Sequence, residues 1–222
     1  TKWTSNGDSL STRFISGDKS VVGKVVLSKF SHLSPCELGV YNTGQLSSLL
    51  SVLGDDIDIN LSQSGDKFIS MEFEDTKRKT KSKYMLSDLS VIPTPPALKN
   101  LPDSFELGIK VDPYFINTFT SGKSALAEAE TFTILTENGE TKIVIGYASI
   151  ASNRVTIPVE TTKNAEIEPI SFNANMFASI LNANKDCESA TLEVSSAGLS
   201  RIQFAIDNYD SEYFLVSTQA VN

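Results

Sequence analysis

The most concentrated positive charge in the sequence lies in the run Lys77-Arg78-Lys79-Thr80-Lys81-Ser82-Lys83. Side chains of this type bind phosphate groups or pair with an acidic neighbouring subunit. A solvated hairpin loop is an equally good interpretation. The chain as a whole has 222 residues and a net charge of −8. Any contact with nucleic acid therefore has to come from a local basic surface, or the nucleic acid has to be held topologically.

Other patterns that could carry chemistry are incomplete. The segment Thr120-Ser121-Gly122-Lys123-Ser124 resembles the end of a phosphate-binding loop, but Asn117 stands where that pattern requires glycine. His32 is the single histidine, which favours neither a His-based metal cluster nor a Ser-His-Asp triad. Cys36 and Cys187 are expected to be reduced, packed thiols. The sequence therefore predicts no enzyme and no cofactor.

Three segments have the apolar spacing of amphipathic helices, at residues 43–53, 113–126 and 174–184. Gly54 is expected to end the first of them. Their outer faces combine small neutral side chains with few charges: Ser47, Ser48, Ser51, Ser121, Ser179, Asn182, Lys123 and Lys185. An ordinary solvent-exposed face explains this composition. A smooth, weakly attractive wall facing DNA phosphates explains it as well.

The sequence repeats itself about 130 positions further on, which favours a duplicated domain. Three landmarks recur in nearly constant register: Asn6-Gly7 as Asn138-Gly139, Tyr41-Asn42 as Phe172-Asn173, and Ser64-Gly65 as Ala197-Gly198. The second copy has a strand at 105–111 and a helix at 113–126 ahead of its Asn-Gly turn, whereas the first has only residues 1–5. We therefore expect roughly 25–30 residues, about one strand and one helix, to be missing ahead of Thr1.

The predicted organisation is a first repeat at residues 1–87, a proline-rich connector at 88–104 and a second repeat at 105–222. The remaining apolar segments predict strands at 10–15, 21–27, 38–41, 57–61, 69–73, 84–89, 131–136, 142–147, 154–160, 190–195, 200–206 and 212–217. The predicted fold class is α+β, with antiparallel sheets that carry helices on one face. Without a long apolar run or a leader pattern, we expect a cytoplasmic protein with no membrane partner.

The order of these elements resembles the repeat unit of DNA sliding clamps, the processivity factors of DNA polymerases. The order is a strand, then Tyr41-Asn42 or Phe172-Asn173, then a short apolar helix and a hairpin with a Gly turn. Residues 172–181, followed by 190–194 and 212–216, are similar to the end of a clamp subunit. Two repeats joined by a proline-rich connector most resemble the clamp of T4-like bacteriophages.

The resemblance implies a closed homotrimeric ring, with sheets outside and helices lining a DNA-sized hole. Such a ring would hold duplex DNA topologically and without sequence specificity. It would tether the replicative DNA polymerase and be opened by an ATP-driven clamp loader, in the cytoplasm of a host cell if the source is viral. No cofactor is implied.

The resemblance also implies three groups of site residues. The DNA-facing group is Lys123, Lys185, Asn182, Lys77, Arg78 and Lys79. The groove for a polymerase tail peptide is Ile92, Leu98, Phe214 and Val216. The subunit interface is Lys81, Lys83 and Tyr84 opposite Arg154 and Glu160 of a neighbouring copy.

The alternative is a duplicated β-rich structural or adaptor protein without DNA linkage, such as a virion component. Two features of the sequence depart from the clamp pattern. The first repeat lacks the strand and helix that open the second, so a ring wall would be thin there. The helix predicted at 43–53 also has no Lys or Arg, which weakens its attraction for phosphate.

Overall fold

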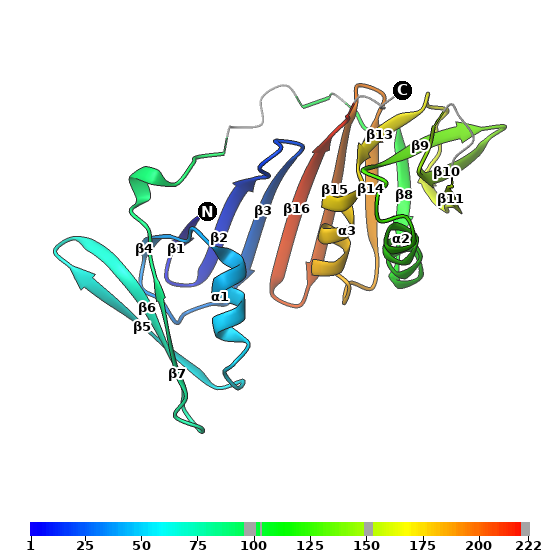
Figure 1. Ribbon diagram of the computed structural model, residues 1–222. Coiled ribbons are helices and arrows are strands. Elements are labelled where there is room, and N and C mark those ends of the chain that lie inside the picture. Colours follow the sequence, from blue (N-terminus) through cyan, green and yellow to red (C-terminus); the bar gives the residue numbers. More distant parts are fainter. Residues whose placement is uncertain (96–100, 103, 149–152, 219–222) are drawn as a thin grey trace. The chain divides into compact units, whose positions relative to one another are not determined.

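The computed structural model describes residues 1–95, 101–102, 104–148 and 153–218, and the chain divides into two compact units (Figure 1). Unit 1 comprises Thr1–Phe14 and Lys24–Pro96, and unit 2 comprises Ile15–Gly23 and Ala97–Asn222. Both consist mainly of antiparallel strands with few helices. The predicted α+β class is confirmed. The assignment of Ile15–Gly23 to the second unit was not predicted.

Unit 1 contains two groups of strands and one helix. One group has the order β3-β2-β1-β4, and the other has the order β5-β6-β7. Ile15 of β2 and Val21–Gly23 of β3 belong to unit 2. The elements are β1 (Lys2–Ser5), β2 (Ser9–Ile15), β3 (Val21–Ser28), β4 (Cys36–Gly39), α1 (Thr43–Leu50), β5 (Ile57–Ser64), β6 (Lys67–Asp75) and β7 (Lys81–Met85). Leu46 of α1 is buried in one core cluster with Met71, Phe73 and Tyr84 from β6 and β7.

Unit 2 contains two corresponding groups of strands and two helices. The strand orders are β11-β10-β9-β13 and β12-β8-β14-β15-β16. The strands are β8 (Leu107–Val111), β9 (Thr131–Glu137), β10 (Glu140–Ile145), β11 (Val155–Pro158), β12 (Thr161–Lys163), β13 (Ile170–Asn173), β14 (Ala190–Ser195), β15 (Leu199–Ile206) and β16 (Tyr209–Val216). The helices α2 (Pro113–Ala125) and α3 (Ala174–Ala183) pack against each other.

The strand orders reproduce the predicted duplication. The order β3-β2-β1-β4 corresponds to β11-β10-β9-β13, and β5-β6-β7 corresponds to β14-β15-β16. In each unit one helix, α1 or α3, joins the two groups. The first hairpin turns differ, because Asn138 and Gly139 both have positive φ (55° and 78°), whereas in the first copy only Gly7 does (94°). The two units therefore share a strand order but differ in the backbone conformation of the first hairpin turn.

Among the described residues, unit 1 has no counterpart of β8 and α2. In unit 2 the fully buried Phe119 of α2 fills the core, and its ring centroid lies 5.1 Å from that of Phe132 and 4.9 Å from that of Phe177. In unit 1, Trp3 and Leu50 are only partly buried. The core of unit 1 is therefore less complete, and β5 lies at an edge of its sheet.

Two element ends differ from the prediction for local reasons. The Asn42 side chain caps α1, and the helix ends at Leu50 and not at Gly54. Beyond it the chain forms a tight turn in which the Leu53 N–H donates to the Leu50 carbonyl at 3.0 Å. The predicted strand at 84–89 stops at Met85, and a short 3₁₀ turn, η1 (Leu89–Val91), follows. The Asp88 side chain starts that turn by accepting from the Ser90 N–H.

Candidate nucleic-acid interface

The exposed faces of the three helices are almost free of charge. Their exposed side chains are hydroxyls and amides, including Gln45, Ser47, Ser48, Asn117, Ser121, Ser124, Asn175, Ser179 and Asn182. Within the bounds of α1, α2 and α3 the one ionisable side chain besides Tyr114 is Lys123. These faces can approach phosphate without repelling it, and they offer few groups that would bind it tightly.

Lys123 does not contribute to the exposed face of α2, contrary to expectation. It is only 7% exposed. Its ammonium donates to the carbonyl oxygens of Ala127 at 2.8 Å and Leu126 at 3.4 Å. A cation at this position satisfies carbonyl groups beyond the end of the helix and interacts favourably with its dipole. The Lys123 ammonium is therefore bound to backbone carbonyl groups, and the expectation that it faces DNA is corrected.

Lys185 and Asn182 are exposed at the end of α3. Lys185 lies beyond the helix, which ends at Ala183 with Asn184 as its C-cap. Asn184 is fully buried; its side-chain amide donates to the Ile180 carbonyl at 2.8 Å. The turn that carries Lys185 is therefore anchored. The neighbouring Asp186 is also exposed, so the local charge is close to neutral.

Lys77, Arg78 and Lys79 form the basic turn, which joins β6 to β7 in unit 1. All three side chains are exposed. Lys77 forms an ion pair with Asp56, and Lys79 lies 3.9 Å from Glu74. Arg78 makes no ion pair with any residue in the described part of the chain. Arg78 is therefore the cation of this turn that is best able to meet an external anion.

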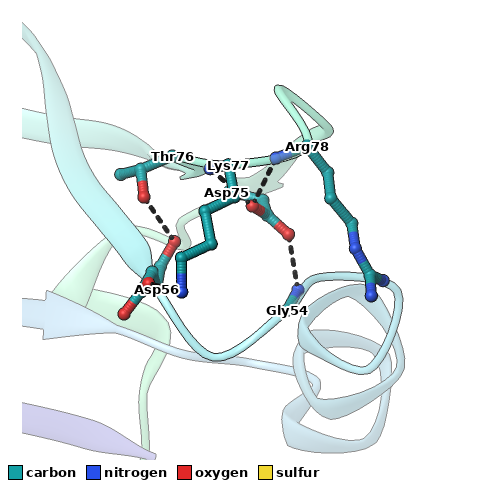
Figure 2. Close-up of polar contacts among 6 residues, drawn as sticks. All are labelled: Gly54, Asp56, Asp75, Thr76, Lys77 and Arg78. Atoms are coloured by element: carbon teal, nitrogen blue, oxygen red, sulfur yellow. Dashed lines mark hydrogen bonds and ion pairs between the residues drawn. The ribbon is translucent and has the colours of Figure 1, made fainter.

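The carboxylate of Asp75 holds the basic turn in place (Figure 2). One carboxylate oxygen accepts from the N–H groups of Arg78 at 2.8 Å and Lys77 at 2.9 Å, and the other accepts from Gly54 at 2.9 Å. These donors, the Arg78 N–H foremost, lower the pKa of the Asp75 carboxyl below its usual range. The turn is thereby tied to the loop that follows α1.

The rest of the basic run has a different environment. Lys81 pairs with Glu74 at 2.9 Å, and Lys83 pairs with Glu72 at 2.8 Å, across the β6–β7 ladder. Because side chains alternate along a strand, both lysines lie on the sheet face opposite the one that carries Tyr84 and contacts α1. The run is therefore divided between an exposed turn and a cross-strand ladder.

The residues expected at a subunit interface are not all exposed. Tyr84 is only 4% exposed, and its hydroxyl accepts from the Asn42 N–H in the core of unit 1, so its side chain cannot form an interface surface. Arg154 is exposed just ahead of β11. Glu160 pairs with Lys110 at 2.8 Å. Both β7 and β11 lie at edges of their sheets among the described residues.

The residues expected to form a groove for a partner peptide differ in how exposed they are. Ile92 is buried in unit 1, Phe214 is buried in unit 2, and Leu98 lies outside the described residues. Val216 is 46% exposed. Of the three members that the structure describes, Val216 alone presents a large exposed apolar side chain.

Sequence reasoning missed a cavity of about 410 Å³ in unit 1. Its apolar lining comes from Phe68, Ile69, Leu86 and Leu89, and the Lys67–Asp88 ion pair borders it. These residues come from β6 and from the segment after β7, and no local pattern in the sequence joins them. Among the described residues, no group of three His, Cys, Asp or Glu side chains could hold a metal ion, and no helix could span a membrane.

Comparisons with known proteins bear on the fold. No protein-family model and no curated protein matches the chain. A crystal structure of proliferating cellular nuclear antigen from Entamoeba histolytica is similar, with a TM-score of 0.75 over 98% of this chain and 89% of that chain. The fold is that of a sliding clamp. The two clamp-fold sequences are 14% identical, so the similarity establishes the fold alone.

Proposed function

We propose that the protein is a sliding clamp that encircles duplex DNA and tethers a DNA polymerase for processive synthesis. The observation that carries the proposal is the duplicated clamp topology, β3-β2-β1-β4 with β5-β6-β7 and β11-β10-β9-β13 with β14-β15-β16. The uncharged exposed faces of α1, α2 and α3 support it further. A wall without carboxylates can lie close to phosphate.

A topological linkage requires little binding energy, because a closed ring leaves the duplex only by opening or at a DNA end. This explains how a chain with a net charge of −8 could act on DNA. The basic turn and Lys185 would supply local, salt-sensitive attraction without base recognition. The expected partner is therefore duplex DNA of any sequence.

The ring would contain three copies, as the resemblance to the clamps of T4-like bacteriophages implies. The β7 edge of one copy would pair with the β11 edge of the next, because unpaired strand edges are templates for pairing between chains. Lys81, Lys83 and Arg154 would lie beside this junction. A polymerase tail peptide would bind near Ile92, Leu98, Phe214 and Val216, and an ATP-driven loader would open the ring.

The decisive experiment measures retention on nicked circular DNA and on the same DNA after linearisation, with the cognate loader and ATP present. A clamp remains on the circle and slides off the linear form. Equal retention on both forms would reject topological linkage. Light scattering over a range of protein concentrations provides the second measurement, since a persistent monomer would favour the structural or adaptor alternative.

A further inference from the structure

We infer that Asp75 is the positioning residue of the basic turn and fixes Arg78 where it can contact a phosphate group of duplex DNA. The inference rests on the proposed function and deepens it. A carboxylate beside a phosphate contact would by charge alone oppose binding. Asp75 instead favours binding, because its carboxylate holds the backbone of Arg78 in position.

The first step is the number of donors that Asp75 receives. It is 2% exposed, at the last position of β6, and its two oxygens accept three backbone N–H groups, from Gly54, Lys77 and Arg78. Hydrogen bonds to an ionised acceptor are shorter and stronger than neutral ones. The carboxylate therefore specifies the path of the backbone through the turn.

The second step is the backbone closure around the same residue. The Asp75 N–H donates to the Thr80 carbonyl, and the Lys79 N–H donates to the Asp75 carbonyl, both at 2.9 Å. Lys79 has φ of +59°, a conformation that costs a non-glycine residue free energy. The anchored turn holds Lys79 in this conformation.

The third step distinguishes Arg78 from its neighbours. The Lys77 side chain is directed to Asp56, and the Thr76 N–H also bonds the Asp56 carbonyl at 2.9 Å. In Figure 2 the Arg78 backbone faces Asp75 while its guanidinium lies well away from that carboxylate. Asp75 thus binds the backbone of Arg78 and leaves the charged group available for phosphate.

The contact between Gly54 and the Asp75 carboxylate can be tested independently by a substitution at Gly54. A Cβ atom built at Gly54 would lie 2.7 Å from the bonded oxygen of Asp75. That distance is too short, so any side chain at residue 54 has to displace the carboxylate. Gly54→Ala therefore disturbs the anchor without changing the charge of the protein.

The experiment compares Asp75→Asn with Asp58→Asn in the full chain, by fluorescence anisotropy with a short duplex DNA over a series of salt concentrations. Both variants lose one negative charge, and Asp58 is an exposed residue of neighbouring β5. Asp58→Asn should bind equally well or slightly more tightly. Asp75→Asn should bind several-fold more weakly, with the slope of log K against log salt reduced by about one.

Two further variants separate positioning from general destabilisation. Gly54→Ala should weaken binding in the same direction as Asp75→Asn, while circular dichroism reports the folded fraction of each. In the Arg78→Gln background, Asp75→Asn should have no further effect on DNA binding. A merely structural role of Asp75 would lower the melting temperature equally in both backgrounds without this dependence on Arg78.

The outcomes are distinguishable. If Arg78→Gln binds DNA like the unmodified protein, the proposed DNA contact at this turn is wrong. If Arg78→Gln weakens binding but Asp75→Asn behaves like Asp58→Asn, the positioning role of Asp75 is overturned and the DNA contact stands. Tighter binding by Gly54→Ala would also overturn it.

Discussion

The hydroxyl group of Tyr84 on β7 accepts a hydrogen bond of 2.9 Å from the backbone N–H of Asn42, the residue that caps α1. The same hydroxyl lies 3.2 Å from the Asn42 carbonyl oxygen and donates to it. One buried side chain thus links an edge strand of the β5-β6-β7 sheet to the start of the helix. The cap geometry of α1 depends on this link as well as on its own sequence.

Tyr84→Phe should destabilise the protein by about 1 kcal/mol, because it removes the hydroxyl group that accepts from the part-buried Asn42 N–H. The Asn42 carbonyl keeps its bond from the Leu46 N–H. Urea denaturation followed by circular dichroism measures the change. Tyr114→Phe is the matched control, since Tyr114 is 78% exposed on α2. Equal effects of the two variants would show that the Tyr84 contact is energetically neutral.

Leu50 and Leu181 occupy equivalent positions in α1 and α3, but Leu181 is fully buried and Leu50 only partly. Leu181→Ala should therefore cost about 2–5 kcal/mol, the range for a large cavity in a closed core. Leu50→Ala should cost clearly less. Denaturant midpoints of the two variants give the comparison, and an equal loss would mean that unit 1 is as well packed at this point as unit 2.

Acid should weaken the basic turn through Asp75. Its pKa is lowered in the folded protein, so its contribution to stability is complete above the ordinary aspartate pKa of about 3.9. The contribution declines as the pH falls from there towards the lower folded value. Urea midpoints measured from pH 6 down to pH 2 should fall less steeply for Asp75→Asn than for the unmodified protein. Parallel curves would contradict this assignment.

Lys123→Met should leave the salt dependence of DNA binding unchanged, because the ammonium is buried against the Ala127 and Leu126 carbonyl groups. The variant should lose about 1 kcal/mol of stability with those hydrogen bonds. Lys185→Met, at an exposed position, should show the reverse pattern in the same two assays. A reduced salt slope for Lys123→Met would place this side chain back among the DNA contacts.

The starts of the helices are local features that follow from residue type. The cap residues Asn42, Asp112 and Asn173 each accept from an N–H of the first helical turn, as their side-chain chemistry requires. The duplicated strand order also followed from sequence landmarks. The short strand β12 did not, because its three residues are held by irregular pairing with β8, a contact distant in sequence.

Two site features could have been predicted from periodicity. Lys123 follows Phe119 by four residues and Ile116 by seven, which places it on the apolar face of α2. Along β7 the alternation places Lys81 and Lys83 on one face and Tyr84 on the other. The tie between Asp75 and Gly54 could not have been predicted, because these residues are distant in sequence and meet only after β5 and β6 have paired. The bonds from the Lys77 and Arg78 N–H groups to Asp75 are local turn contacts.

The uncovered edge of β5 and the partly filled core of unit 1 imply that the two halves of the chain unfold at different temperatures. Amide protons of α1 and β5 should exchange with solvent sooner than those of α3 and β14, because segments with fewer buried apolar contacts open at lower free energy. Warming would then loosen the first half of the chain while the second is still intact. A single melting temperature would describe neither half.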